Sequence, residues 1–292
     1  MRNTGLPTVS VVIATYNHRD FVVDALSSVF EQTFRDYEII VVNDGSQDDT
    51  ANLLRPFAES GAISYCEQTN AGPAAARNRG LAAAKGEFIA YLDDDDRWPQ
   101  DKLEWQVLAL LSNPEISVIA GGYSIIDEDG NENEGPLSRE GAVTFESLFD
   151  RNPFCSPGQT LIRAERLRAI GGFDTSIWGS DDFDAWFRLL RTGGITYINR
   201  IALRYRLHPL NSSNDVTRIA HQALEVIRRH AKSAPAGAQT GLMVRGYVSV
   251  FKYALRKMLN NSKSVLRRGS LGGILKFISG LRFRRCRNEI GM

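Results

Sequence analysis

Three short apolar runs alternate with amphipathic stretches over about the first 120 residues of the chain. The runs lie at residues 9–14, 38–42 and 87–92, and in each of them both alternating faces are apolar. Such runs are typical of strands that are covered on both faces of a parallel sheet. The intervening helix-like stretches lie at residues 20–32, 46–59 and 73–85. The alternation predicts βαβ units and an α/β fold.

A polar cluster follows each of these three runs directly, at residues 15–17, 44–46 and 93–96. In open α/β sheets, ligands bind beside the carboxyl ends of the strands. We therefore expect the chemistry of the protein to gather at one edge of its sheet.

The alternation is looser beyond residue 115, where a polar, glycine-bearing stretch near residues 129–141 suggests an insertion. Further strands are expected at residues 117–121, 159–162, 195–198 and 202–206, and further helices at residues 181–191 and 216–231. Residues 233–241 have the composition of a linker. We therefore place one domain at residues 1–232, with halves at about 7–120 and 121–232, followed by an extension at residues 233–292.

The extension differs from the rest of the chain in charge. Residues 241–292 contain 12 of the 35 Lys and Arg residues but only one of the 34 Asp and Glu residues. This segment also carries apolar residues at helical spacing, interleaved with Lys and Arg. Two interpretations remain open: basic helices that dock on the acidic body, or helices that bind an anionic membrane surface. The acidic body argues against nucleic-acid binding.

Cysteine number and the lack of a leader-like segment bear on the cellular compartment of the protein. The three cysteines are widely spaced and odd in number, which predicts free thiols and fits a reducing cytoplasm. No leader-like segment and no apolar run of about 18 residues is found. We expect a cytoplasmic protein that is peripheral on the inner face of the cell membrane if its extension binds there.

Residues 93–96 form a run of four aspartates, Asp93, Asp94, Asp95 and Asp96. Adjacent carboxylates repel one another unless a cation neutralises them. Mg²⁺ and Mn²⁺ prefer such oxygen ligands and are commonly held by one or two carboxylates together with substrate phosphates. A solvated turn before the next helix would explain four aspartates alone, but their position at the end of a buried strand favours a cation site.

A second acidic motif, Asp181 and Asp182, follows Ser180 at the predicted start of a helix. Carboxylates in a first helical turn interact favourably with the helix dipole, which is the plain structural explanation. A carboxylate whose pKa is tuned by burial and nearby charge is also suited to act as a general base. The spacing does not choose between these interpretations.

Taken together, these motifs resemble the family 2 nucleotide-sugar-dependent glycosyltransferases over roughly residues 7–212. Six segments occur in the family's order: VSVVIATYN, VVNDGSQDDT, NAGPAAARNRGLAAAKGEFIAYLDDDDRW, GGFD, GSDDFDAW and YRLHPLNSS. The resemblance implies a GT-A fold, which is a Rossmann-like mixed sheet flanked by helices, here with a helical, basic C-terminal extension. It makes residues 7–120 the nucleotide-binding half and residues 121–232 the acceptor-binding half.

The resemblance also implies roles in donor binding. The uracil of a UDP-sugar would be bordered by Ala14, Thr15 and Tyr16. Other donor contacts would be made by Asp44 to the base, Arg77 to the diphosphate and Asp94 to the ribose. The DxD motif Asp93-x-Asp95, with His208 nearby, would hold Mn²⁺ or Mg²⁺.

The activity implied is inverting sugar transfer to a hydroxyl acceptor, either a saccharide or a lipid-linked one, in the synthesis of cell-surface polysaccharide or glycolipid. Asp182 matches the catalytic base of inverting members. The family's usual Glu-Asp pair is Asp181-Asp182 here, so Asp181 is an alternative base, and Asn43 replaces a usual Asp. A non-catalytic nucleotide-sugar-binding or membrane scaffold protein of the same fold remains the alternative function. No glycine-rich loop follows a predicted strand, which disfavours nucleotidyltransferases and dinucleotide oxidoreductases.

Overall fold

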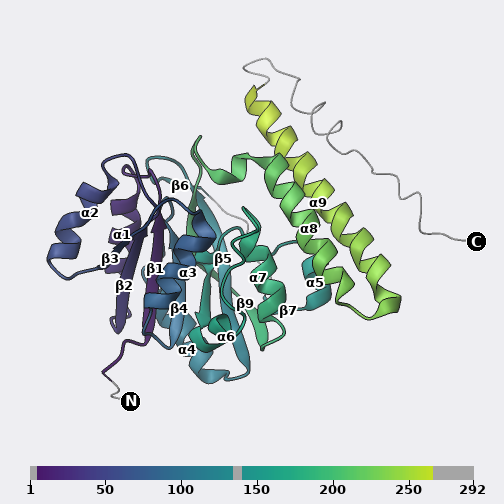
Figure 1. Ribbon diagram of the computed structural model, residues 1–292, viewed down its shortest axis with the longest axis horizontal. Helices are drawn as coiled ribbons and strands as arrows, with labels where there is room; N and C mark the ends of the chain where they lie inside the picture. The colour runs from purple at the N-terminus through teal and green to yellow at the C-terminus, as the bar shows by residue number, and fades with distance from the viewer. Residues whose placement is uncertain (1–4, 134–139, 266–292) are drawn as a thin grey trace, which may run out of the picture.

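A mixed β-sheet runs through the centre of the protein and is flanked by helices, as Figure 1 shows for this computed structural model. The structure describes residues 5–133 and 140–265. The strand order is β3-β2-β1-β4-β8-β5-β9-β7, and β6 pairs with β5. The strands are β1 Val9–Thr15, β2 Tyr37–Asn43, β3 Ser64–Glu67, β4 Phe88–Asp93, β5 Ile116–Ile126, β6 Glu132–Asn133, β7 Gly141–Val143, β8 Thr160–Arg163 and β9 Gly194–Arg206.

The helices cover both faces of this sheet. They are α1 Val22–Phe30, α2 Thr50–Glu59, α3 Pro73–Ala83, α4 Lys102–Ser112, α5 Phe145–Asp150, α6 Ala164–Ala169, α7 Asp181–Leu189, α8 Val216–Lys232 and α9 Ala236–Val265. Because side chains alternate along β1, Val12 packs with residues of α3 and α7, whereas Val11 and Ile13 pack with residues of α1 and α4. The apolar runs in the sequence therefore reflect two separate cores on either side of the sheet.

The predicted parallel βαβ arrangement is confirmed, since β1 pairs in parallel with both β2 and β4. The sheet becomes mixed at β8, which is antiparallel to β4 and β5. The two strands predicted at residues 195–198 and 202–206 form the single strand β9, whose pairing with β5 shifts register near Gly121 and Gly122.

Close contact between α3 and β1 depends on a glycine. A Cβ atom added at Gly80 would lie 2.2 Å from Cγ1 of Val12, so only glycine fits at this point without displacement. This contact brings α3, which carries Arg77, close to the sheet.

The linker predicted at residues 233–241 is short in the structure, where α8 ends at Lys232 and α9 begins at Ala236. The two helices pack side by side, as Figure 1 shows, and α9 also contacts α5. Leu242, Val250 and Ala254 of α9 are buried. Within residues 5–133 and 140–265, no helix is long and apolar enough to cross a membrane. The remainder of the predicted basic extension, residues 266–292, lies outside the described residues.

Candidate functional site

The carboxyl ends of β1, β2 and β4 lie side by side at one edge of the sheet. Their register pairs Thr15 with Asn43 and Ala14 with Asp93. The three polar clusters of the sequence therefore meet at one edge of the sheet, where ligands bind in open α/β sheets.

Asp93 forms a partly buried network with Arg77. Nη2 of Arg77 lies 2.8 Å from Oδ1 of Asp93, and Nη1 lies 2.9 Å from Oδ2 of Asp181. Ser156 donates a hydrogen bond of 2.6 Å to Oδ2 of Asp93. Burial alone would raise the pKa of Asp93, but the charge of Arg77 and the Ser156 hydrogen bond lower it. One guanidinium thus joins the aspartate run of β4 to the acidic motif of α7.

Asp94 and Asp96 point to different partners. Oδ2 of Asp94 accepts a 3.1 Å hydrogen bond from the Tyr16 backbone, and Oδ1 lies 2.8 Å from Nδ1 of His18. Asp96 is fully buried and accepts a 2.8 Å hydrogen bond from the Arg206 backbone. Burial and the charges of the neighbouring aspartates raise the pKa of Asp96 well above its usual range. The run is therefore a set of separately bonded carboxylates and not a solvated acidic turn.

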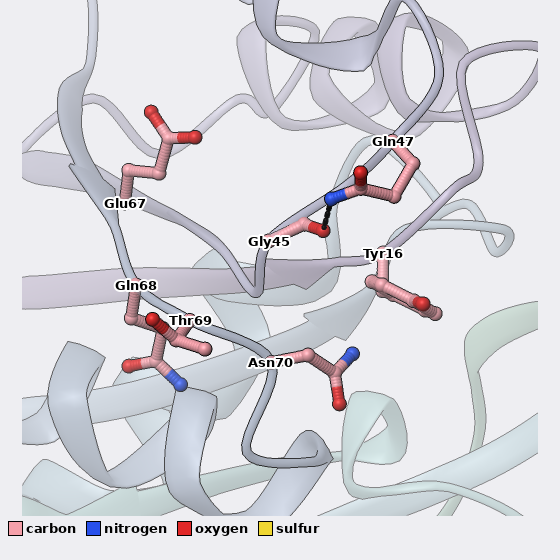
Figure 2. Close-up of a pocket in the computed structure, with 7 residues that line it drawn as sticks. All are labelled: Tyr16, Gly45, Gln47, Glu67, Gln68, Thr69 and Asn70. Atoms are coloured by element: carbon pink, nitrogen blue, oxygen red, sulfur yellow. Dashed lines mark hydrogen bonds between the residues drawn. The ribbon is translucent and has the colours of Figure 1, made fainter.

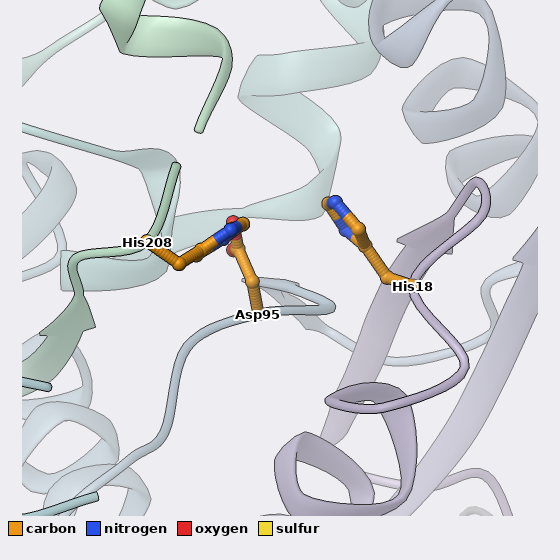
Figure 3. A group of neighbouring side chains, drawn as sticks. All are labelled: His18, Asp95 and His208. Carbon is orange, nitrogen blue, oxygen red and sulfur yellow. The ribbon is translucent and has the colours of Figure 1, made fainter. Parts of the chain in front are cut away.

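A candidate metal centre lies where Asp95 faces His18 and His208, as Figure 3 shows. One ligand atom from each residue lies within 4.8 Å of the others, and Nε2 of His208 is 2.9 Å from Oδ2 of Asp95. Nδ1 of His208 is buried and has no hydrogen-bond partner among the described residues. Mixed carboxylate and imidazole donors fit a divalent transition metal such as Mn²⁺ better than Mg²⁺.

The residues around this centre differ in part from those in the sequence hypothesis. The structure brings together Asp95 and His208, whereas Asp93 is paired with Arg77. His18 was not among the predicted ligands, although it comes directly after the polar cluster at the end of β1. The carboxylate of Asp94 on Nδ1 of His18 resembles the outer partners that orient metal-bound histidines.

Asp182 stands beside the Arg77 network, at the start of α7. Burial and the adjacent charge of Asp181 raise its pKa to about 7. Oδ1 of Asp182 accepts a 2.6 Å hydrogen bond from its neighbour Phe183. Asp181, the alternative base of the sequence analysis, is tied to Arg77 by an ion pair. Asp182 is thus the carboxylate whose pKa suits proton transfer near neutral pH.

An open pocket of about 610 Å³ lies beside the ends of β1 and β2, as Figure 2 shows. It is lined by Tyr16, Gly45, Gln47, Glu67, Gln68, Thr69 and Asn70. The Tyr16 ring is 43% exposed, which leaves a face available for stacking.

Asp44 is buried behind this pocket and holds its wall in place. Its carboxylate accepts hydrogen bonds from the Gln68 side chain at 2.7 Å and from the backbones of Ala71 and Gly72, each at 2.9 Å. Gly45 has a positive φ of 78°, and a Cβ there would lie 2.9 Å from the nitrogen of Asn70. The loop after β3 thus closes over the end of β2.

Comparison with known proteins decides the family. The sequence profile described as "Glycosyl transferase family 2" matches residues 10–171. The chain belongs to glycosyltransferase family 2. TuaG of Bacillus subtilis, a putative teichuronic acid biosynthesis glycosyltransferase, is 32% identical over 69% of this chain and 79% of its own length. WfgD of Escherichia coli is named a UDP-Glc:α-D-GlcNAc-diphosphoundecaprenol β-1,3-glucosyltransferase. It is 31% identical over 71% of this chain and 80% of its own length.

Solved structures of similar fold support a GT-A fold for this chain. S. aureus TarS 1–349 in complex with UDP-GlcNAc superposes with a TM-score of 0.68 at 17% identity, over 94% of this chain and 79% of TarS. The mannosyltransferase PcManGT of Pyrobaculum calidifontis, in complex with GDP-Man and Mn²⁺, has a TM-score of 0.63 at 19% identity, over 95% and 80% of the two chains. At this identity the likeness establishes the fold alone.

The candidate metal centre leads to a test by substitution. We expect Asp95→Asn to weaken Mn²⁺ binding at least about tenfold, because it removes the anionic ligand between two imidazoles. Calorimetric titration of Mn²⁺ into the nucleotide-free protein measures this directly.

Asp96→Asn is the matched control for that titration. Asp96 is buried against the Arg206 backbone and lies outside the cluster of His18, Asp95 and His208, so Mn²⁺ affinity should stay within about twofold of the wild type. Equal losses in both variants would mean that the run acts only through its total charge, and the three-residue centre would then be wrong.

Proposed function

We propose that this protein is an inverting glycosyltransferase. It transfers the sugar of a UDP-sugar donor to a hydroxyl group of a lipid-linked saccharide. The observation that carries the proposal is Asp182, a carboxyl group with a pKa of about 7 beside the Arg77–Asp93 ion pair. Membership of family 2 supports transfer, and the relatives TuaG and WfgD support a role in cell-surface polysaccharide synthesis.

The donor binds along the edge formed by β1, β2 and β4. The pocket beside Tyr16 accepts the uracil, which stacks on the exposed ring and borders Ala14 and Thr15. Asp44 holds the pocket wall in place beside the base, and Asp94 contacts the ribose. A UDP-sugar donor is supported by two names, since that of WfgD includes UDP-Glc and that of the TarS complex includes UDP-GlcNAc.

Asp95, His208 and His18 hold a divalent metal, for which Mn²⁺ is the better fit. When bound, this ion supplies positive charge that stabilises the diphosphate leaving group. Arg77 adds a fixed guanidinium at the same edge, where its two ion pairs hold it toward the phosphates. The Mn²⁺ complex of PcManGT supports the use of a divalent metal in this fold.

Transfer is a single displacement. Asp182 accepts the proton of the acceptor hydroxyl while that oxygen forms a bond to the anomeric carbon of the donor. The bond between this carbon and the diphosphate oxygen breaks, and UDP leaves with the electron pair. Attack from the face opposite the leaving group inverts the anomeric configuration. Asp181 raises the pKa of Asp182 and also anchors Arg77, so it positions the base.

Asp182→Asn tests the base. We expect kcat to fall by at least about a hundredfold, because the amide cannot take the proton, while UDP affinity stays within about twofold. In the wild type, kcat should decrease as the pH falls through about 7, where Asp182 becomes protonated. Coupled detection of released UDP measures the rate, and calorimetry measures the affinity. Normal turnover by Asp182→Asn would rule out this base.

The long helix α9 supports a position at the membrane surface. Its side away from the body carries a stripe of exposed apolar residues, which we call the outer stripe. The outer stripe consists of Val244, Tyr247, Val248, Phe251, Leu255 and Leu259, each between 38% and 56% exposed. Lys252 and Arg256 flank it. An apolar face with flanking cations is typical of helices that lie in an anionic membrane interface.

Both interpretations of the basic extension thus receive support, because α9 docks on the body by one side and exposes the outer stripe on the other. The basic residues 266–292 continue from its end. We place the protein at the inner face of the cell membrane, where a lipid-linked acceptor would be within reach.

Vesicle binding tests the outer stripe. We expect the full chain to bind phosphatidylglycerol-containing vesicles, and the double variant Phe251→Ser with Leu255→Ser to bind at least about tenfold more weakly. The control is Leu108→Ser with Leu111→Ser on α4, whose side chains are 60% and 54% exposed away from α9. Sedimentation with vesicles measures binding. No binding by the wild type, or the same loss in the control, would contradict the membrane contact.

A further inference from the structure

The three candidate metal ligands come from three separate segments of the chain, as Figure 3 shows. His18 follows β1, Asp95 follows β4 and His208 follows β9. The local sequence therefore does not fix the distances between their ligand atoms. A metal site needs these atoms held within about 0.5 Å of their binding positions. Contacts between the three segments must supply that order.

The guanidinium of Arg206, the last residue of β9, joins several of these segments. Arg206 is only 2% exposed. Its Nε donates a 2.8 Å hydrogen bond to the backbone oxygen of Asp95. Its Nη1 donates to the backbone oxygens of Asp127 and Glu128, at 3.1 and 2.8 Å, and its Nη2 is paired with the carboxylate of Asp24 in α1. The planar fork of a guanidinium can serve these four acceptors together, which the ammonium of a lysine cannot.

Arg206 also supports the two histidines, through the ring of Phe21. The guanidinium carbon lies 5.2 Å from the centre of the Phe21 ring. This ring packs in turn on His208 and on His18, with ring centres 4.7 and 6.2 Å apart. Arg206 thus contacts the backbone of one candidate ligand, Asp95, directly and the rings of the other two through Phe21.

His208 lacks the outer hydrogen bond that usually orients a metal-bound histidine. The second ring nitrogen of such a histidine commonly donates to a carboxylate or a carbonyl. Nδ1 of His208 is buried and has no such partner in the part of the chain that the structure describes. Other contacts must therefore orient this ring.

Asn211 supplies contacts of this kind. Its Oδ1 accepts a 2.6 Å hydrogen bond from the His208 backbone. Its Nδ2 donates to Oδ2 of Asp95 at 3.3 Å and to the backbone oxygen of Arg206 at 3.1 Å. Asn211 is only 6% exposed, so these hydrogen bonds are shielded from water. One amide side chain thereby connects two of the candidate ligands.

We propose that Arg206 and Asn211 are positioning residues that hold the metal centre in its binding geometry. Arg206 fixes the Asp95 backbone, and Asn211 fixes the Asp95 carboxylate and the loop of His208. This inference rests on the proposed function, because it concerns the same metal centre. The YRLHPLNSS segment, residues 205–213, thus contains one candidate ligand and both residues that orient it.

Titration of Mn²⁺ into the nucleotide-free full chain tests this role. We expect Asn211→Ala to weaken Mn²⁺ binding at least about tenfold, as is typical when an outer partner of a metal ligand is lost. Arg206→Lys keeps the charge but not the fork, and should weaken Mn²⁺ binding to a similar extent. With Mn²⁺ raised to saturation, UDP should bind both variants within about threefold of the wild type, because neither side chain is placed on the nucleotide.

Asp24→Asn is the matched control. It removes the charge that pairs with Arg206 but leaves the hydrogen bonds to Asp95 in place. We expect it to lower the melting temperature and to keep Mn²⁺ affinity within about twofold of the wild type. A loss of Mn²⁺ affinity equal to that of Asn211→Ala would indicate general loosening of the fold and would overturn the positioning role.

The wild-type titration separates two failures. If the wild type binds no Mn²⁺, the proposed metal centre is wrong, and the positioning role falls with it. If the wild type binds Mn²⁺ and Asn211→Ala binds it equally well, only the positioning role is overturned. Weak UDP binding by Asn211→Ala at saturating Mn²⁺ would also overturn it, by indicating a donor contact. Asn211→Ala decides the matter alone if Arg206→Lys does not fold.

Discussion

The largely buried ion pairs of Arg77 hold the candidate site together. Arg77 comes from α3, Asp93 from the end of β4, and Asp181 from the start of α7, so three elements that are distant in sequence meet at one guanidinium. A buried charge is tolerated only when it is paired and hydrogen-bonded. Removing any one of these three groups would leave the others uncompensated, which couples the geometry of the site to the stability of the fold.

The same pairing explains why Asp181 and Asp182 differ. Asp181 forms an ion pair with Arg77. Burial and the adjacent charge of Asp181 raise the pKa of Asp182 to about 7. Two adjacent carboxylates thereby acquire different environments, which suit Asp181 to positioning and Asp182 to proton transfer. Two residues of the same type that are adjacent in sequence can therefore differ in pKa and in ion pairing.

Much of this architecture follows from the sequence, because its signals are local. Apolar runs such as residues 9–14 report burial on both faces, and the polar residues directly after them mark the carboxyl edge. What the sequence leaves open depends on contacts between distant segments. His18 joins Asp95 and His208 only through the fold, and the pairing of Arg77 with Asp181 spans 104 positions. Both sides of α9 are apolar, and the packing of the fold shows which one is docked and which one is the outer stripe.

We propose that the edge formed by β1, β2 and β4 is a metal-assisted site for a UDP-sugar. The most direct test is calorimetric titration of UDP, GDP and dTDP into the full-length protein, each with and without Mn²⁺. We expect UDP to bind most tightly and its affinity to depend on Mn²⁺. Absence of nucleotide binding in the presence of Mn²⁺, or equal binding of all three nucleotides without it, would rule out this site.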